Sequence, residues 1–241
     1  MQRLDRYLSE AGVASRSALR EIIRAGRVAV DGTRVTRAEY KLDEKAAVVT
    51  LDGVPVAQRK TVVVMLHKPA GYVTSTEDPR DKTVMELLPQ AFRALELRPV
   101  GRLDKETEGL LLFTNDGELL HRLISPRSGI EKVYYAEHEG QAEQQDVLAF
   151  AEGLTLADGT KCRPAQLLPM GVGKSRVTLS EGKYHQVRRM MASRGLRVNY
   201  LKRLAEGAIS LGDLPCGAVR ELTPEEYAGL TYGQDDEGSL P

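Results

Sequence analysis

The residues best suited to chemistry lie in one segment, Gly101 to Gly117, which reads GRLDKETEGLLLFTNDG. Its first half is a charged loop that ends at Gly109, and its second half is an apolar run of strand character. A loop that leads directly into a buried strand can hold a carboxylate at a fixed place beside a rigid sheet. Four acids are candidates, and spacing alone does not choose among them: Asp104, Glu106, Glu108 and Asp116.

The chain lacks the patterns of several common ligand sites. A calcium loop alternates oxygen ligands before a closing glutamate, and a phosphate loop follows GxxxxGK[ST]; this segment has neither. With only Cys162 and Cys216, a disulfide scaffold and a four-cysteine zinc site are excluded. His67 and His121 have no cluster of ligand-type residues around them in the sequence, so we predict no metal.

Composition and charge distribution indicate an ordinary globular protein with two basic zones. Of the 241 residues, 41% are hydrophobic, no apolar run approaches the roughly 18 residues of a membrane helix, and the first residues lack a signal-peptide segment. We therefore expect a cytoplasmic protein without membrane contact. Residues 1–60 hold 12 basic and eight acidic residues, and residues 183–203 hold seven basic residues and no acid. The two zones predict phosphate contacts, with solvated surfaces as the alternative.

Residues 1–60 are expected to form a small basic domain followed by a linker. Apolar residues spaced three and four apart from Leu4 mark a first helix, Gly12 is its expected end, and Ser15 is the expected N-cap of a second helix. A hairpin signal follows at Asp31-Gly32. This arrangement suits a nucleic-acid backbone, and a cap on the main domain is the alternative. The second helix and its end carry one row of arginines: Arg16, Arg20, Arg24 and Arg27.

Residues 61–232 predict an α+β domain around a largely antiparallel sheet, because strands and helices follow one another without strict alternation. We expect strands at residues 62–66, 72–76, 110–114, 132–137, 176–179, 197–201 and 208–211. We expect helices at residues 84–88, 117–123, 143–151, 184–194 and from Pro224 onward. The polar segment 233–241 is expected to be disordered.

Several segments resemble one enzyme family in the same order along the chain. GRLDKETEGLLLFTNDG resembles the catalytic-aspartate motif of the pseudouridine synthases, and MLHKPAGYVTST, HRLISPRSGIEKVYY, EGKYHQVRRMMASRG and LKRLAEGAISLGDLPCGAVREL resemble further parts of that family. The N-terminal text RLDRYLSEAGVASRSALREIIRAGRVAVDG resembles the αL RNA-binding module that the RsuA branch joins to such a domain. The resemblance covers about residues 1–230.

The resemblance implies an isomerase that breaks the N1–C1′ bond of a uridine, turns the base and joins C5 to C1′. Nothing is oxidised and no water enters, so no cofactor is implied. Asp104 matches the family's catalytic aspartate, which either forms an adduct with the sugar or acts as the base that gives a glycal. Both routes stay open at this stage. The target nucleotide has to leave its stack to reach such a pocket.

The same resemblance assigns the remaining site residues. Tyr134 matches the tyrosine that stacks on the target base, with Tyr135 as the competing assignment because adjacent strand residues face opposite sides. Arg188 matches the basic residue that pairs with the catalytic aspartate, and Leu201 matches the apolar floor of the pocket. His185 is expected to pack or to lie at the surface, with a contact to RNA as the alternative. We also assign Arg102, Leu103 and Lys132 to the pocket. The predicted RNA contacts are Arg3, Arg16, Arg20, Arg24, Arg27, Lys183, Arg189, Lys202 and Arg203.

The pair Tyr184-His185 and the text GYVTSTEDP resemble the small-subunit branch, whose substrate is one uridine of 16S ribosomal RNA. Relatives that act on large-subunit RNA usually carry Asn-Arg or a similar pair instead. The expected partner is ribosomal RNA within a small-subunit assembly particle, and we expect a monomer. Three alternatives stay open: a synthase for large-subunit RNA, a non-catalytic ribosome-assembly factor, and a nucleoside hydrolase, which would need a second positioned carboxylate.

Overall fold

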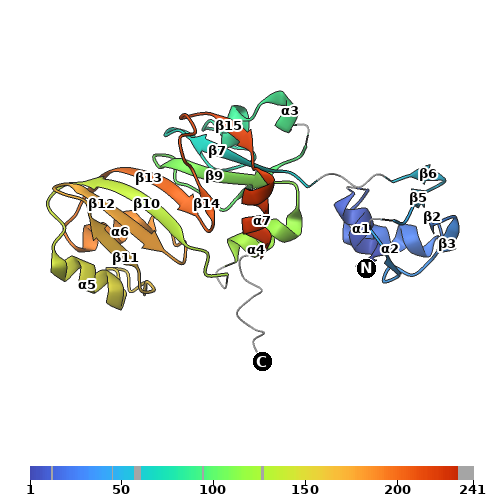
Figure 1. Cartoon of the computed structure of the whole chain (residues 1–241), viewed down its shortest axis with the longest axis horizontal. Coiled ribbons are helices and arrows are strands. Elements are labelled where there is room, and N and C mark those ends of the chain that lie inside the picture. The colour runs from blue at the N-terminus through green and yellow to red at the C-terminus, as the bar shows by residue number, and fades with distance from the viewer. Residues whose placement is uncertain (12, 45, 57–60, 94, 126–127, 233–241) are drawn as a thin grey trace. The chain divides into compact units, whose positions relative to one another are not determined.

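The computed structural model describes residues 1–11, 13–44, 46–56, 61–93, 95–125 and 128–232. The chain divides into two compact units, Met1–Thr61 and Val62–Pro241 (Figure 1). The first unit has one hydrophobic core and the second has two. The predicted helix end at Gly12, the linker positions 57–60 and the tail 233–241 lie outside the described residues.

The first unit joins two short helices and small antiparallel sheets around one core. Ser15 caps the second helix as predicted, because its side chain accepts a hydrogen bond from Ala18 N at 3.4 Å. Leu4, Leu8 and Ile23 are fully buried against the strands. The elements are α1 (Leu4–Glu10), α2 (Arg16–Arg24), β1 (Gln2–Arg3) paired with β4 (Lys41–Leu42), and a sheet in the order β3 (Thr33–Val35), β2 (Val28–Val30), β5 (Val49–Leu51), β6 (Val54–Pro55).

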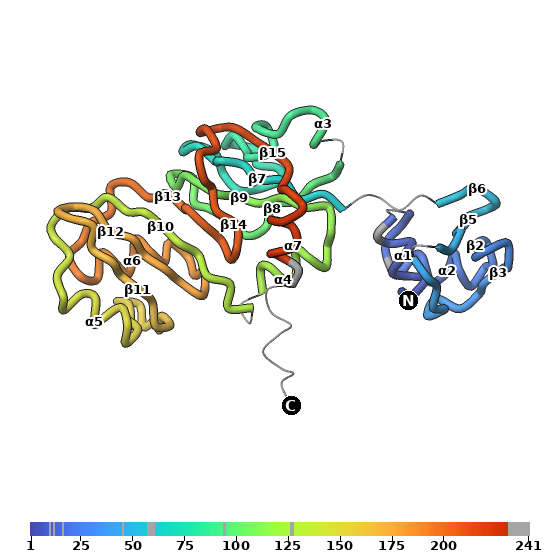
Figure 2. The backbone as a smooth tube through the Cα atoms, viewed as in Figure 1, coloured from blue at the N-terminus to red at the C-terminus, as the bar shows by residue number. Residues whose placement is uncertain are grey.

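The second unit is built on a nine-stranded sheet whose pairs are antiparallel except for one, so the α+β prediction is confirmed (Figures 1 and 2). The main path runs β11 (Gln166–Pro169), β12 (Lys174–Leu179), β10 (Lys132–His138), β13 (Val198–Glu206), β9 (Glu108–Thr114), β7 (Val63–Lys68), β15 (Val219–Glu221). Two short strands join this path at its sides: β14 (Ile209–Ser210) on β13 and β8 (Arg98–Val100) on β9.

Helices cover both faces of this sheet, because alternate strand residues feed two separate cores. One core takes Leu111 and Phe113 of β9 with residues of α5 and α6, and the other takes Leu110 and Leu112 with residues of α4 and α7. The helical elements of the unit are η1 (Val84–Leu87), α3 (Gln90–Arg93), α4 (Gly117–Ile124), α5 (Gln144–Glu152), α6 (Gln186–Ser193) and α7 (Pro224–Tyr232).

Two sequence expectations for the second unit are wrong in detail. Residues 72–76 form no strand; Val73 makes only an isolated bridge with Thr83, and the Thr74 hydroxyl binds the backbone of a distant loop instead. The helix expected from residue 184 begins two residues later, because His185 has left-handed backbone angles (φ 48°, ψ 34°) that end the preceding loop. Both departures lie beside the charged loop at residues 101–109.

Among the described strands of this sheet, one pair is parallel: β9 joins β13 through Glu108–Lys202 and Gly109–Arg203. Gly109 has φ +109°, and a Cβ atom built on it would overlap the backbone N, C and O atoms of Arg203. Only glycine combines this backbone conformation with such a close approach of two chains. The end of the charged loop can therefore pack directly against the backbone of β13 because Gly109 has no side chain.

We predict that Gly109→Ala lowers the free energy of unfolding by about 3 kcal/mol, from the unfavourable φ and the overlap together. Gly212→Ala is the matched control, because Gly212 also has positive φ (+54°) but open space around its Cβ position. Its expected loss is about 1 kcal/mol. Urea unfolding of both variants measures the difference, and equal losses would contradict the steric argument.

Candidate active site

A cleft of about 1080 Å³ lies in the second unit. Its walls come from the charged loop 101–107, from β10 and β13, and from the segment 179–187 that leads into α6. This volume is sufficient for a nucleotide. Six of the seven residues predicted for catalysis or for the pocket line it: Arg102, Leu103, Asp104, Lys132, Tyr134 and Leu201.

Lys68 anchors the backbone of the charged loop, and its side chain is fully buried at the end of β7. Its ammonium donates three hydrogen bonds, to the carbonyl oxygens of Pro69 (3.0 Å), Lys105 (3.1 Å) and Thr107 (2.9 Å). All three donors of the group are thereby used. Burial lowers the pKa of Lys68 to about 8, while the carboxylates of Glu106, Asp104 and Glu108 favour its charged form.

A second anchor holds the loop on the other side of Asp104. The Thr74 hydroxyl donates to the Leu103 carbonyl at 2.8 Å and accepts from the Leu103 amide at 3.1 Å. The Asp104 carbonyl itself accepts from Thr107 N at 3.0 Å. Asp104 therefore sits between two fixed backbone segments, and its side chain is 35% exposed toward the cleft.

His185 is the residue that faces Asp104 across the cleft, and sequence reasoning missed it. Its Nε2 lies 3.5 Å from Asp104 Oδ1, an ion pair when the imidazole is protonated. Its ring stacks on Tyr184 with centroids 3.9 Å apart, and Tyr184 is 75% exposed. Gln186 supports this turn, since its side chain accepts from Lys183 N at 2.8 Å and donates to Glu181 at 2.6 Å.

The floor of the cleft carries a buried network of ionisable groups. Arg203 is 1% exposed and its Nη2 lies 3.2 Å from Glu206 Oε2, while Lys132 Nζ lies 3.7 Å from Glu206 Oε1. Arg203 Nε also donates to the Leu110 carbonyl at 2.7 Å. Burial raises the pKa of Tyr134, whose position on β10 is opposite Arg203, so its phenol stays neutral at physiological pH.

The prediction that Arg203 contacts RNA phosphates is therefore wrong, because its guanidinium is buried in the cleft floor. Side chains alternate along β13, and this alternation directs Leu201 and Arg203 to the cleft while Tyr200 and Lys202 point to the other face. A run of basic residues in the sequence does not show which of their side chains face the cleft.

The predicted pair between Arg188 and Asp104 is also wrong. The Arg188 guanidinium donates to the carbonyl oxygens of Val198 at 3.0 Å and Glu106 at 3.5 Å. It thereby joins α6 to the start of β13 and to the charged loop, and it is not among the cleft-lining residues. Because α6 begins only at Gln186, its first turn presents Arg188 to backbone carbonyls rather than to the carboxylate.

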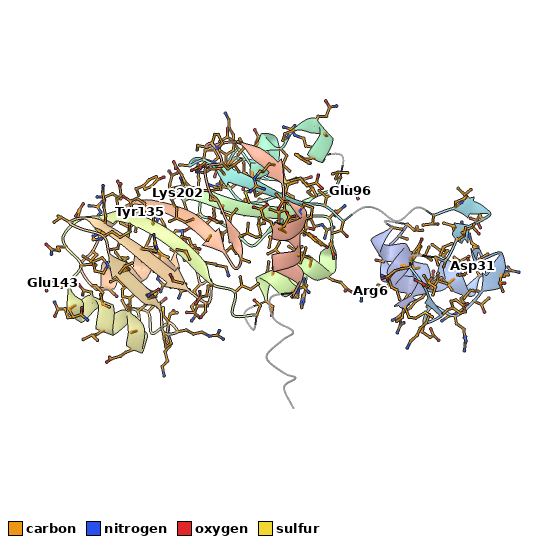
Figure 3. All side chains as sticks on the ribbon, viewed as in Figure 1. Arg6, Asp31, Glu96, Tyr135, Glu143 and Lys202 are labelled. Atoms are coloured by element: carbon orange, nitrogen blue, oxygen red, sulfur yellow. The ribbon has the colours of Figure 1, made fainter. Side chains whose placement is uncertain are left out.

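Of the two adjacent tyrosines, Tyr134 lines the cleft and Tyr135 does not. The Tyr135 hydroxyl donates to Glu137 at 2.8 Å, and its ring makes an edge contact with Tyr200 at a centroid distance of 6.3 Å. Tyr135 pairs with Lys202 across β10 and β13, where Figure 3 labels both residues, and neither lines the cleft. The alternation along β10 separates the two candidates.

Many of the predicted RNA-contact cations are paired within the chain. Five of the seven cations between residues 183 and 203 form ion pairs: Lys183–Glu181, Arg189–Asp158, Arg194–Asp146, Arg197–Glu139 and Arg203–Glu206. In the first unit, Arg3 pairs with Asp5 and Arg27 with Asp52. Arg20 and Arg24 of α2 are exposed, and no acid of the described residues pairs with them. The Arg16 side chain lies outside the described part.

The expectation that His67 lies apart from other ligand-type side chains is wrong. One ligand atom each from His67, Glu108 and Cys216 lie within 4.8 Å of one another. Strand pairing between β7 and β9, and the loop before β15, bring together residues that are far apart in the sequence. Only the sheet register reveals this proximity.

Comparisons with known proteins agree with this fold and site. The sequence profile described as RNA pseudouridylate synthase matches residues 62–193, and the S4 domain profile matches residues 2–48. The uncharacterized RNA pseudouridine synthase YtzG of Bacillus subtilis is 39% identical over 237 residues, which cover 96% of this chain and 99% of that protein. The ribosomal small subunit pseudouridine synthase A of Salmonella typhimurium is 42% identical over 233 residues, covering 95% and 99%.

A crystal structure of a pseudouridylate synthase superposes with a TM-score of 0.68 at 31% identity, covering 95% of this chain and 100% of that one. The chain therefore belongs to the RNA pseudouridine synthase family and carries an N-terminal S4 domain, as its motifs predicted. It is an enzyme of the isomerase class. Among the described residues, none of the helices has the length and apolarity that crossing a bilayer requires.

We predict that Lys68→Met destabilises the second unit by about 3 kcal/mol or more, because one buried and two partly buried carbonyl oxygens lose their donor. Urea unfolding followed by far-UV circular dichroism measures the loss. Lys105→Met is the control in the same loop, since Lys105 forms only an exposed ion pair with Asp81, and it should change stability little. A Lys68→Met protein as stable as the control would show that the ammonium does not support the loop.

Proposed function

We propose that the chain converts one uridine of 16S ribosomal RNA to pseudouridine, with Asp104 as the catalytic carboxylate. The observation that carries the proposal is the place of Asp104, on the wall of a nucleotide-sized cleft and between two anchored backbone segments. The name of the Salmonella relative and the Tyr184-His185 pair support the small-subunit target.

In the proposed reaction, the carboxylate of Asp104 either attacks C1′ of the everted nucleotide or removes a sugar proton to give a glycal. Either route leaves the bonding electrons of N1–C1′ on the base. Arg203 is suited to stabilise that charge, because its guanidinium is a buried cation that lines the cleft, with Nη2 in an ion pair with Glu206 at 3.2 Å. We assign this electrostatic role to Arg203 and no catalytic role to Arg188.

Tyr134 is proposed as the stacking surface for the base, since its ring lines the cleft floor beside Arg203. Leu103 and Leu201 are buried and line the same cleft, so they help to exclude water while the detached base turns. Exclusion of water favours rejoining of the base at C5 over hydrolysis.

The ion pairs of Glu206 argue against a nucleoside hydrolase. A hydrolase of the two-carboxylate type needs a second acid that activates water. Glu206 lines the cleft, but it is buried and paired with both Arg203 and Lys132. A buried carboxylate that is paired with two cations is not free to bind and orient a water molecule, so it is unsuited to that role.

Binding of the RNA is proposed to use both units. Arg20 and Arg24 on α2 offer exposed, unpaired charges for phosphates, and the stacked Tyr184 and His185 offer an aromatic surface at the cleft for a neighbouring base. A small-subunit assembly particle as substrate, a monomeric state and a cytoplasmic location stay predictions.

We expect the wild-type protein to release tritium from small-subunit RNA labelled as 5-³H-uridine, because only C5 glycosylation expels that hydrogen. Large-subunit RNA labelled in the same way should release none. Asp104→Asn should abolish release while it binds the RNA as the wild type does. Glu106→Gln, an exposed acid of the same loop, is the control that retains release.

Each alternative has its own outcome in this assay. Tritium release from large-subunit RNA alone would show that the substrate is large-subunit RNA. RNA binding by the wild type without tritium release would identify a non-catalytic assembly factor. Full release by Asp104→Asn would remove this residue from its proposed role.

We predict that the double variant Arg20→Ala/Arg24→Ala binds small-subunit RNA more weakly and lowers the slope of log affinity against log salt by about two, one for each lost phosphate contact. Arg27→Ala is the matched control and should have a smaller effect, because Asp52 already neutralises Arg27. Filter binding at several salt concentrations measures both. Wild-type affinity and slope in the double variant would refute phosphate binding by α2.

A further inference from the structure

We propose that His67, Glu108 and Cys216 form a binding site for one divalent cation of the zinc class. The site lies at the ends of β7 and β9 and in the loop that leads to β15. None of the three residues lines the cleft that holds Asp104, so the site is separate from the catalytic one. The inference is independent of the RNA target and of the reaction.

The three ligand atoms are brought together by backbone that is already fixed. His67 belongs to β7, and Leu110 is its partner on β9, two residues beyond Glu108. The loop with Cys216 is tied to the same strand, because Gly217 N donates to the His67 carbonyl at 2.8 Å and His67 N donates to the Ala218 carbonyl at 3.0 Å. The ligand atoms lie within 4.8 Å of one another on this frame.

The two ring nitrogens of His67 have the environments expected of a metal-binding histidine. It is only 4% exposed, and Nδ1 lies 2.7 Å from the Leu214 carbonyl oxygen. A carbonyl can only accept, so Nδ1 carries a proton, and Nε2 is the ring nitrogen left to bind a cation. Nε2 is buried and has no hydrogen-bond partner among the described groups. A carbonyl bonded to the remote ring nitrogen is the usual support for a ligating histidine.

Glu108 has a comparable support. Its Oε2 accepts a hydrogen bond from the Tyr200 hydroxyl at 2.7 Å, which fixes the carboxylate and leaves Oε1 for a cation. Hydrogen bonds to neighbouring polar groups thus orient two of the three ligands, His67 and Glu108.

The mixture of donor atoms selects the class of ion. Nitrogen, oxygen and sulfur together suit zinc, whereas magnesium and calcium prefer oxygen alone. A thiolate and a carboxylate with a neutral imidazole supply two negative charges, which balance a divalent ion. Zinc bonds of about 2.0–2.3 Å require the three atoms to move closer together. Cys216 is exposed on a loop, so it can make that movement and give the ion an entry path.

Cobalt is the first probe, because a cobalt–thiolate bond gives a charge-transfer absorption that reports sulfur ligation directly. We expect the reduced full-length protein to bind one Co²⁺ with this absorption and to lose it when Zn²⁺ displaces the cobalt. Cys216→Ala should abolish the band. Cys162→Ala is the control that keeps it, since Cys162 is the other free cysteine and lies outside the cluster.

The second measurement is zinc affinity, by competition with a chromophoric chelator. His67→Asn and Glu108→Gln should each weaken zinc binding by more than about tenfold, because even the loss of a supporting group costs 10–100-fold. Circular dichroism and a thermal melt of each metal-free variant establish that it is folded. Absence of the cobalt band, its persistence in Cys216→Ala, its loss in Cys162→Ala, or wild-type zinc affinity in His67→Asn or Glu108→Gln would each overturn the proposal.

Discussion

The site depends on one buried ammonium group and the three carbonyl oxygens around it. Lys68 ends β7 and binds the backbone of Pro69, Lys105 and Thr107, so a strand of the sheet directly fixes the turn that follows Asp104. A buried charge is tolerated only when its hydrogen bonds are complete and counter-charges are near. The loop accepts two of the three hydrogen bonds, Pro69 accepts the third, and the carboxylates of the loop favour the charged ammonium. The acidic character of the loop is therefore structural as well as chemical.

Sheet alternation distributes the remaining functional groups between two faces. Tyr134, Leu201 and Arg203 lie on the cleft side of β10 and β13, whereas Tyr135 and Tyr200 lie on the other side. The consecutive residues His67 and Lys68 likewise belong to two different sites. His67 is part of the candidate cation site, and Lys68 binds the backbone of the catalytic loop. One nine-stranded sheet thus supports two chemically different sites.

The sequence predicted what local patterns and motif text encode, and it failed where long-range register decides. Ser15 as a cap, the strand after Gly109 and the cleft position of Asp104 all follow from local patterns or motif resemblance. The sequence assigned the wrong roles to Arg188 and Arg203, because the position of an arginine in the sequence does not show what surrounds its side chain. In the structure, Arg203 is buried in the cleft, whereas Arg188 donates to backbone carbonyl oxygens. The His67 cluster joins three distant segments, so no local pattern could predict it.

The parallel contact between β9 and β13 has a consequence for biosynthesis. It joins Glu108 to Lys202, so nearly a hundred residues must be made before the partner strand exists. Contacts of such long sequence separation form late, because the intervening chain has to be closed into a loop first. A nascent chain that has reached only β12 holds its aspartate motif without the strand that completes the cleft. Competence to act on RNA therefore arises only after β13 has been synthesised.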